Sequence, residues 1–258
     1  MTGIQFRFYE ELGDFLPPER RKLDFHYASK GRETVKHAIE ACGVPHTEVE
    51  LILVNGASVG FDYLLRDGDR VSVYPRFETF DITPLLRVRE KPLRQPRFVA
   101  DAHLGGLARY LRMLGYDTLC NERYQDVDIA AISARDGRIV LTRDRDLLMH
   151  RIITHGRYVR AVRPRAQLIE VVEALDLAGG FCPFTLCMAC NAPLRRATRD
   201  EARGLVPADT LERFTDFSQC TSCERIYWRG SHYRRMRKFI DMTFVANHAG
   251  GNKLHPVV

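Results

Sequence analysis

The sequence predicts an α/β protein built from three folded parts. Between residues 97 and 178, β-type runs alternate with helix-type segments, which is typical of βαβ units and a largely parallel sheet. Residues 1–80 place strands around a single helix, and residues 179–240 are poor in core residues but hold two Cys-x-x-Cys pairs. We expect residues 81–96, which hold three prolines and four basic residues, to form an exposed linker and residues 241–258 to form a flexible tail.

Composition and charge limit the class of protein. With 258 residues, the chain is long enough for two or three small domains. It has no apolar run of 18 residues and no signal-peptide pattern at its start, so we expect a cytoplasmic protein without a membrane partner. The net charge of +6 is uneven: residues 1–80 carry 10 Lys/Arg against 13 Asp/Glu, and residues 179–240 carry 11 against 6. A basic C-terminal part suits a polyanion such as RNA, although charge alone fits a solvated surface equally well.

The first 80 residues fit a β-grasp fold. An alternating strand, IQFRFYEEL, and a second strand near residues 22–27 precede the helical segment ETVKHAIEACG. Two further strands, VELILVNG and DRVSVYP, flank a turn at residues 67–69. The segment ILVNGASVGFDYLLRDGDRVSVYP resembles the ubiquitin-like sulfur-carrier proteins of the thiamine and molybdopterin pathways.

Those carriers act through a C-terminal Gly-Gly, and this resemblance raises a carrier function as one alternative. Here the chain continues beyond residue 80 into another domain, and Gly250-Gly251 is followed by seven more residues. We therefore expect a docking or structural module that could receive a protein partner rather than a sulfur carrier.

Acidic residues follow two of the β-type runs in the central part. Asp101 comes directly after FVA, and Asp144 and Asp146 follow RIVLT. Because ligands gather beyond the carboxyl ends of strands in open α/β sheets, these carboxylates can converge on one divalent cation, Mg²⁺ or Mn²⁺. Asp128, at the start of a helix, is a fourth candidate and Asp126 a less favoured one.

A competing interpretation makes some of these aspartates helix caps. Asp is a favoured residue at the N-cap and in the first helical turn, which could account for Asp128, Asp144 and Asp146. Asp101 fits this interpretation least, because a carboxylate directly after a buried strand needs a partner. Taken together the residues favour a metal site. His103 could move a proton there, although a structural role is more common for such a histidine.

The central and C-terminal segments resemble the Mut-seven C-terminal RNase family, a PIN-like nuclease domain followed by a zinc ribbon. The matching segments are FVADAHLGGLARYLRMLGYD, the helix start at Asp128, RIVLTRDRDLL and the cysteine pairs that follow. This resemblance implies a PIN-like, Rossmann-like parallel-sheet domain, a β-grasp domain in front and a metal-dependent ribonuclease activity. It carries Asp101, Asp128 and Asp144 over as catalytic metal ligands and leaves Asp146 as a fourth by position. Many PIN domains have a glutamate where this chain has Asp128.

Four cysteines predict a structural zinc site. Cys187, Cys190, Cys220 and Cys223 supply four thiolates, and such a closed tetrahedral set leaves no position for substrate. The long stretch between the pairs fits a ribbon with an inserted helix near residues 208–214. Cys182 is an alternative ligand that lacks a neighbouring cysteine of its own.

Several arginines are candidates for binding RNA phosphates, because guanidinium groups match phosphate geometry. They are Arg109 and Arg112 at i, i+3 spacing on one predicted helix, Arg143 between the candidate ligands, and Arg225, Arg229, Arg234 and Arg235 after the last cysteine. Tyr227 and Trp228 lie among the last group and could stack on bases, or pack as a ribbon strand. The helical arginines could also be a solvated face.

The predicted function is metal-dependent hydrolysis of RNA, with a structured RNA such as tRNA as the target. The alternative is a non-catalytic RNA-binding or adaptor protein that retains the fold. The sequence does not indicate an oligomeric state.

Overall fold

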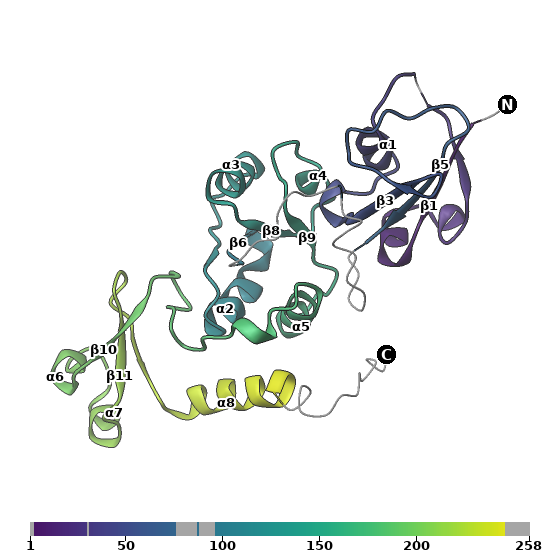
Figure 1. The fold of residues 1–258 in the computed structure, drawn as a ribbon. Coiled ribbons are helices and arrows are strands. Elements are labelled where there is room, and N and C mark those ends of the chain that lie inside the picture. Colours follow the sequence, from purple (N-terminus) through teal and green to yellow (C-terminus); the bar gives the residue numbers. More distant parts are fainter. Residues whose placement is uncertain (1–2, 30, 76–86, 88–95, 246–258) are drawn as a thin grey trace. The chain divides into compact units, whose positions relative to one another are not determined.

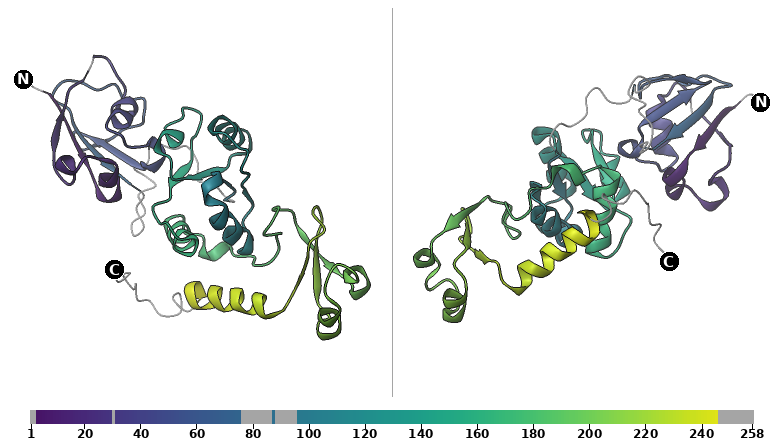
Figure 2. Two further views of the ribbon diagram at one scale, coloured as in Figure 1. Left: turned by 180° about the vertical axis from the view of Figure 1, so that it is seen from behind. Right: turned by 60° about the horizontal axis from the view of Figure 1, so that its bottom comes forward.

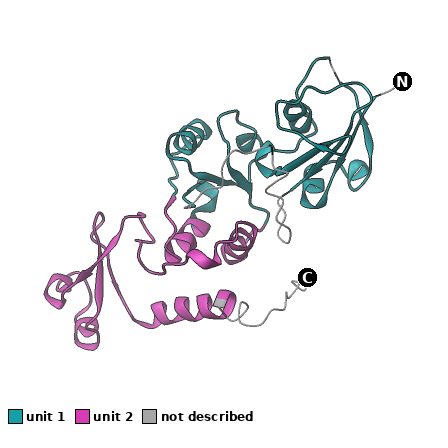
Figure 3. Ribbon diagram, viewed as in Figure 1, with its two compact units in different colours: residues 1–105, 119–160 teal, residues 106–118, 161–258 magenta. Residues whose placement is uncertain are grey.

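The computed structural model describes residues 3–29, 31–75, 87 and 96–245 and has the predicted α/β architecture (Figure 1). Apart from Arg87 and Pro96, the predicted linker lies outside the described residues, as does Gly250-Gly251. The chain forms two compact units, residues 1–105 with 119–160 and residues 106–118 with 161–258, and each is described by itself (Figure 3). The domain boundaries expected from the sequence remain predictions.

The N-terminal part of the first unit is a β-grasp-like mixed sheet with the strand order β2-β1-β5-β3-β4. Strands β1 and β5 are parallel, and the other neighbours are antiparallel. Its elements are β1 (Ile4–Phe8), η1 (Glu10–Phe15), η2 (Pro18–Arg20), β2 (Phe25–Tyr27), α1 (Val35–Ala41), η3 (His46–Glu48), β3 (Leu51–Val54), β4 (Ala57–Ser58) and β5 (Arg70–Tyr74). The predicted β-grasp order is confirmed.

Alternation of apolar residues explains this sheet. In β1, Ile4, Phe6 and Phe8 are buried, whereas the residues between them are partly exposed, as a strand with one core face requires. They pack with Ile39 of α1 in one continuous core. Helix α1 begins where the side chain of Thr34 accepts a hydrogen bond from a backbone N–H, a standard N-cap.

A four-stranded sheet with the order β7-β6-β8-β9 forms the centre of the predicted nuclease part. Strands β6, β8 and β9 are mutually parallel, and every residue of β8 is buried, as expected for the middle of a covered parallel sheet. In the first unit this part contains β6 (Phe98–Ala100), η5 (Ala102–Leu104), α3 (Asp126–Asp136), β8 (Ile139–Thr142), α4 (Arg145–Leu148) and β9 (Gly156–Tyr158), with β7 (Thr118–Leu119) at the boundary.

The second unit contains α2 (Gly105–Met113), α5 (Pro164–Ala174), η6 (Ala178–Gly180), α8 (Ser231–Ile240) and the π-helix η7 (Asp241–Val245). The ring of Phe239 on α8 lies 5.9 Å from that of Tyr110 on α2 and 6.2 Å from that of Phe244. Residues 241–245, which were expected to begin a flexible tail, are helical, and Phe244 among them is buried. Apolar packing of Phe244 outweighs the polar composition of the segment. Residues 246–258 lie outside the described part.

The C-terminal ribbon of the second unit is an antiparallel sheet with the order β10-β11-β12. Its strands are β10 (Leu194–Ala197), β11 (Phe217–Cys220) and β12 (Ile226–Trp228), and two short helices, α6 (Arg199–Ala202) and α7 (Ala208–Arg213), are inserted between β10 and β11. Figure 2 shows from two sides that α8 continues the chain after this sheet. Helix α7 is at the position predicted for the inserted helix. None of the helices in the described residues is long and apolar enough to cross a membrane.

Candidate metal centres

A threonine joins the two acidic strand ends of the parallel sheet. Thr142, the last residue of β8, is fully buried, and its Oγ1 donates a 2.9 Å hydrogen bond to Oδ2 of Asp101. The same Oγ1 accepts a 2.9 Å hydrogen bond from the backbone N–H of Asp144. The backbone N–H of Asp101 also donates to the carbonyl of Leu141, at 3.0 Å. The ends of β6 and β8 therefore hold Asp101 and Asp144 beside one hydroxyl.

Both aspartates also cap short helices. Oδ1 of Asp101 accepts from the backbone N–H of His103 at 3.3 Å, and Oδ1 of Asp144 accepts from that of Asp146 at 2.8 Å. The side chain of Asp101 is half-buried, whereas Asp144, Asp146 and His103 are exposed. Capping and metal binding do not exclude each other, because each carboxylate oxygen can accept more than one partner.

Asp128 lies in the first turn of α3 and is exposed. Its Oδ2 accepts a 3.0 Å hydrogen bond from the N–H of Gln125, which completes a capping box with Gln125 as the N-cap. Asp126 is the first residue of the helix and is also exposed. The helix therefore starts where the sequence predicted, and Asp128 does take part in capping its N-terminus.

Within the described ranges, the four cysteines form the one cluster in which three or more possible ligand atoms of His, Cys, Asp or Glu lie within 4.8 Å of one another. The structure thus links Asp101 to Asp144 through Thr142 but does not bring three of the candidate carboxylates that close. Mg²⁺ commonly keeps several waters and takes one or two protein carboxylates, so this oxygen donor set fits such an ion without a complete protein cage.

The cysteines form the second candidate metal centre. The Sγ atoms of Cys187 and Cys223 are 3.6 Å apart, those of Cys190 and Cys220 are 3.3 Å apart, and all four lie within 4.8 Å of one another. The residues after each pair, Asn191 and Glu224, both have left-handed backbone conformations, with φ of 72° and 58°. Four converging thiols in two matching turns fit a tetrahedral structural zinc.

The environment of Cys187 favours the thiolate that zinc binding needs. Burial acts to raise the pKa of this thiol, but hydrogen bonds from the Tyr227 hydroxyl and from the N–H groups of Cys190 and Ala189 outweigh it and lower the pKa to about 6. The Tyr227 oxygen lies 3.1 Å from Sγ of Cys187. Tyr227 therefore supports the cysteine cluster, and its suggested role in base stacking stays a prediction.

Arg112 has a structural position that contradicts its predicted contact with RNA. Its side chain is buried, and Nε donates to the carbonyl of Thr118 at 2.9 Å. Nη1 donates to the carbonyls of Met188 and Ala189 at 3.2 and 2.9 Å, the two residues between the first cysteines. Helical spacing alone suggested a solvated face, whereas the guanidinium in fact fixes the first cysteine turn against the end of α2.

The remaining candidate RNA-binding arginines are exposed: Arg109, Arg143, Arg225, Arg229, Arg234 and Arg235. Arg143 donates to the carbonyl of Arg160 at 3.0 Å. Trp228 packs against the small apolar core of the ribbon, so the strand-packing explanation holds for it as well. Cys182 is exposed and does not belong to the cysteine cluster.

Sequence reasoning missed the linking residues Thr142 and Arg112. Thr142 had one available signal, since it ends a buried strand directly before the acidic turn, where a hydroxyl can bond to both sides. Arg112 had none, because the two carbonyls that make it a link to the cysteine turn lie more than 70 residues away along the chain.

A parallel sheet with acidic strand ends, an N-terminal β-grasp-like sheet and a C-terminal antiparallel sheet with four clustered cysteines define a three-part α/β protein. The family model described as the Mut7-C RNAse domain matches residues 96–240, and the one described as Mut7-C ubiquitin matches residues 1–81. The first match covers more than half of the chain, and the chain belongs to the Mut7-C RNase family. Membership implies ribonuclease activity with RNA as the substrate. Comparisons with curated proteins and with solved structures gave no significant match.

Proposed function

We propose that the protein is a metal-dependent ribonuclease that hydrolyses phosphodiester bonds in structured RNA such as tRNA. The observation that carries this proposal is the hydroxyl of Thr142, which ties Asp101 and Asp144 together at neighbouring strand ends inside the matched RNase domain. Ligands of open α/β sheets bind at this edge.

Asp101 and Asp144 would hold Mg²⁺ or Mn²⁺, and Asp128 and Asp146 would be further ligands of the same ion. Their oxygen atoms are the hard donors that these cations prefer. A bound divalent ion of this kind lowers the pKa of its water and offsets charge that develops on a phosphodiester. The protein's part is to fix two carboxylates while leaving room for water and for the phosphate.

Two features of the chain support RNA binding. Arg143 directly precedes Asp144 in the sequence. Its exposed side chain is held in one orientation by the hydrogen bond that its guanidinium donates to the carbonyl of Arg160. In the second unit, α8 packs through its aromatic residues while Arg234 and Arg235 remain exposed. Arginine forks on a fixed helix suit phosphates without reading sequence.

The four cysteines would hold a zinc ion that maintains the ribbon and takes no part in hydrolysis. All four positions of a tetrahedral ion would be filled by thiolates. The zinc would thereby also anchor the turn that Arg112 holds.

The proposal is tested with the full chain, labelled tRNA and added Mn²⁺. Asp101→Asn and Asp144→Asn remove a carboxylate charge with little change in shape, and each should lower cleavage on the order of 100-fold. Asp209→Asn, which changes an exposed carboxylate in the first turn of α7, should cleave like the wild type. Cleavage that persists in both the Asp101 and Asp144 variants, or that needs no divalent ion, would overturn a metal-dependent reaction at this site, whereas RNA binding without cleavage by the wild type would favour the non-catalytic alternative.

A further inference from the structure

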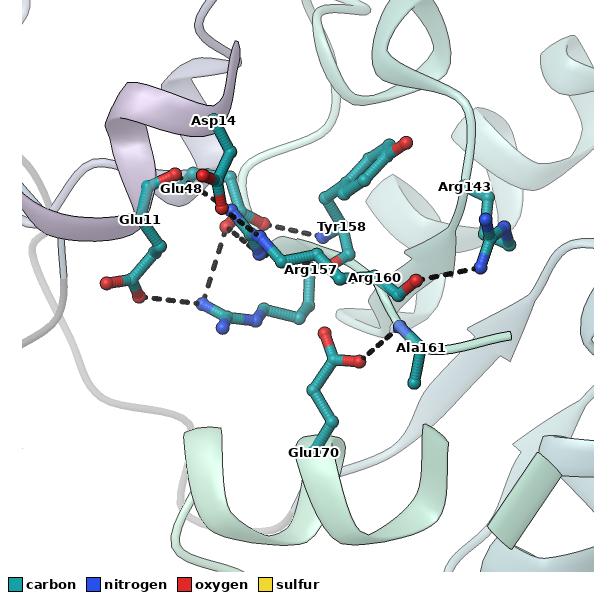
Figure 4. A network of polar contacts seen from close by, with 9 residues as sticks. All are labelled: Glu11, Asp14, Glu48, Arg143, Arg157, Tyr158, Arg160, Ala161 and Glu170. Atoms are coloured by element: carbon teal, nitrogen blue, oxygen red, sulfur yellow. Dashed lines mark hydrogen bonds and ion pairs between the residues drawn. The ribbon is translucent and has the colours of Figure 1, made fainter. Parts of the chain in front are cut away.

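The N-terminal β-grasp domain contacts the edge strand β9 of the parallel sheet through a buried carboxylate (Figure 4). Glu48, the last residue of η3, has a fully buried side chain, and its Oε1 accepts a 2.5 Å hydrogen bond from the backbone N–H of Tyr158. An edge strand leaves such N–H groups unpaired, and covering them is a common requirement of sheets. Glu48, a residue of the β-grasp domain, covers one such N–H group of β9.

The second oxygen of Glu48 faces two arginines, Arg157 in β9 and Arg160 two residues after its end. Its Oε2 lies 3.3 Å from Nη1 of Arg157 and 3.7 Å from Nη1 of Arg160. Nε of Arg160 also pairs with Oδ2 of Asp14 at 3.1 Å, and Nη1 of Arg157 lies 3.6 Å from Oε1 of Glu11. Burial raises the pKa of Glu48, while both guanidiniums and the N–H of Tyr158 favour its ionised form. Three acids of the N-terminal domain therefore meet two arginines of the nuclease sheet.

Further contacts surround this network. The ring of Phe15 packs edge-on against Tyr158 with centroids 5.3 Å apart, and the guanidinium of Arg160 lies 5.1 Å from the Phe15 ring centre. The buried His46 lies with Nε2 2.8 Å from the carbonyl of Ile153 and with Nδ1 2.7 Å from Oε1 of Glu40. The contact thus combines apolar packing with ion pairs and hydrogen bonds between the two domains, as a specific docked interface requires.

On its other side, β9 pairs with β8, the strand that ends beside the candidate metal ligands. Tyr158 is the parallel-sheet partner of Thr142, and the N–H of Val159 donates to the carbonyl of Thr142 at 2.8 Å. Thr142 in turn holds both Asp101 and Asp144 through its hydroxyl. Hydrogen bonds, joined by the covalent segment Tyr158–Val159 and by Thr142 itself, therefore connect Glu48 in the N-terminal domain with the acidic strand ends.

We propose that the β-grasp domain is a built-in part of the nuclease, in which Glu48 acts as a positioning residue for Asp101 and Asp144 by holding β9 in place. The positioning role of Glu48 depends on the ribonuclease function proposed above, whereas the contact between the β-grasp domain and β9 does not. It gives the N-terminal domain an intramolecular partner and assigns the surface formed by η1 and η3 to that contact.

Physical chemistry explains why one residue can matter this much. Strand β9 has three residues and pairs with the sheet along one side, so backbone bonds to β8 alone hold it weakly. Loss of the Glu48 charge leaves the half-buried guanidiniums of Arg157 and Arg160 with only their outer partners Glu11 and Asp14, which is unfavourable because the buried anion between them is gone. In Glu48→Gln, one amide oxygen can still accept from Tyr158, but the amide NH₂ then points its donors at the donors of Arg157 and Arg160.

The test compares the full-length wild type with Glu48→Gln and uses Glu19→Gln, an exposed glutamate of the same domain, as the matched control. Hydrogen exchange of the amides in 156–160 and 140–146 should become roughly tenfold faster in Glu48→Gln, while the amides of β1 and β5 exchange as before. The dissociation constant for Mn²⁺, measured by titration without RNA, should rise about fivefold or more, and kcat should fall with little change in KM. The control should behave like the wild type.

A milder variant keeps the inference testable if Glu48→Gln does not fold. Asp14→Asn weakens the outer pair with Arg160 and should change the same amides in the same direction by a smaller factor, with the exposed Asp62→Asn as its control. Unchanged exchange of β9 in the folded variants overturns the docking. Faster exchange with unchanged Mn²⁺ affinity and kcat overturns the positioning role. A wild type that neither binds Mn²⁺ nor cleaves RNA overturns the proposed function and the positioning role together, while the exchange data still decide the docking.

Discussion

Thr142 and Asp101 are joined across neighbouring strands by a 2.9 Å hydrogen bond from hydroxyl to carboxylate. The bond lies at the carboxyl edge of the sheet, and the same hydroxyl receives the N–H of Asp144. Since one oxygen atom contacts both acidic strand ends, the separation of the two aspartates depends on this buried side chain more than on the exposed loop that follows it.

Thr142→Val should damage the nuclease centre without disturbing the strand. Valine keeps the β-branched shape but leaves Oδ2 of Asp101 and the N–H of Asp144 without their shared partner, which should cost about 1–3 kcal/mol of stability. Mn²⁺ affinity and RNA cleavage should each fall on the order of tenfold, as is typical when a residue that orients metal ligands is lost. Thr142→Ser retains the hydroxyl and should recover most of the activity. Equal activity of the valine and serine variants would contradict this role.

Variants of Arg112 and Arg109 should distinguish a structural arginine from a candidate RNA-binding arginine on the same helix, α2. Arg112→Met removes three buried hydrogen bonds to backbone carbonyls, so it should lower the free energy of unfolding by about 2–5 kcal/mol and speed zinc loss to a chelator. Arg109→Met changes an exposed side chain and should leave stability within about 0.5 kcal/mol. Thermal unfolding and zinc release measure the first effect, and RNA affinity measures any effect of Arg109. Similar stabilities of the two variants would argue against the anchoring of the cysteine turn by Arg112.

The sequence was informative where local pattern decides structure. Alternation in residues 4–8 predicts the N-terminal sheet and the βαβ order around residues 98–142 predicts the parallel sheet, and the Cys-x-x-Cys spacing predicts the thiol cluster. The acidic strand ends are adjacent because parallel strands end on one edge, a rule that needs no coordinates.

Residues whose role depends on distant partners were beyond this kind of reasoning. Glu48 lies in a three-residue turn with no periodic pattern, and its partner Tyr158 is 110 residues further along the chain. Arg112 has the spacing of a solvated helix face, yet it is buried against the cysteine turn. Such contacts arise from tertiary packing, which overrides the local preference of a charged side chain for water.

Zinc removal should unfold the ribbon while the β-grasp domain keeps its fold. The three-stranded ribbon has a core of few apolar residues, so it depends on its metal, whereas the N-terminal core is extensive. Trp228 is the single tryptophan of the chain and packs in the ribbon core, so its fluorescence reports on this region. A chelator should shift its emission to longer wavelength, and metal analysis should find about one zinc per chain.

Cysteine variants provide the matched control for this measurement. Cys187→Ser should reproduce the shift of Trp228 emission without chelator, and Cys182→Ser, which changes an exposed thiol outside the cluster, should not. Wild-type fluorescence and zinc content in the Cys187 variant would show that the ribbon folds without this ligand.

The basic face of α8 should contribute to RNA affinity through phosphates alone. Arg234 and Arg235 are exposed and have no ion pair among the residues of the described chain, whereas Arg237 on the same helix pairs with Asp241 at 3.1 Å. Glutamine has a helix propensity similar to that of arginine, so Arg234→Gln with Arg235→Gln removes two charges and leaves α8 intact. The slope of log affinity against log salt should become shallower by about one per arginine that contacts a phosphate, equally for RNAs of different sequence. Arg213→Gln, an exposed arginine on α7, should leave the slope unchanged. An unchanged slope in the double variant would place the RNA on another surface, and a loss confined to one RNA sequence would indicate base recognition instead of phosphate binding.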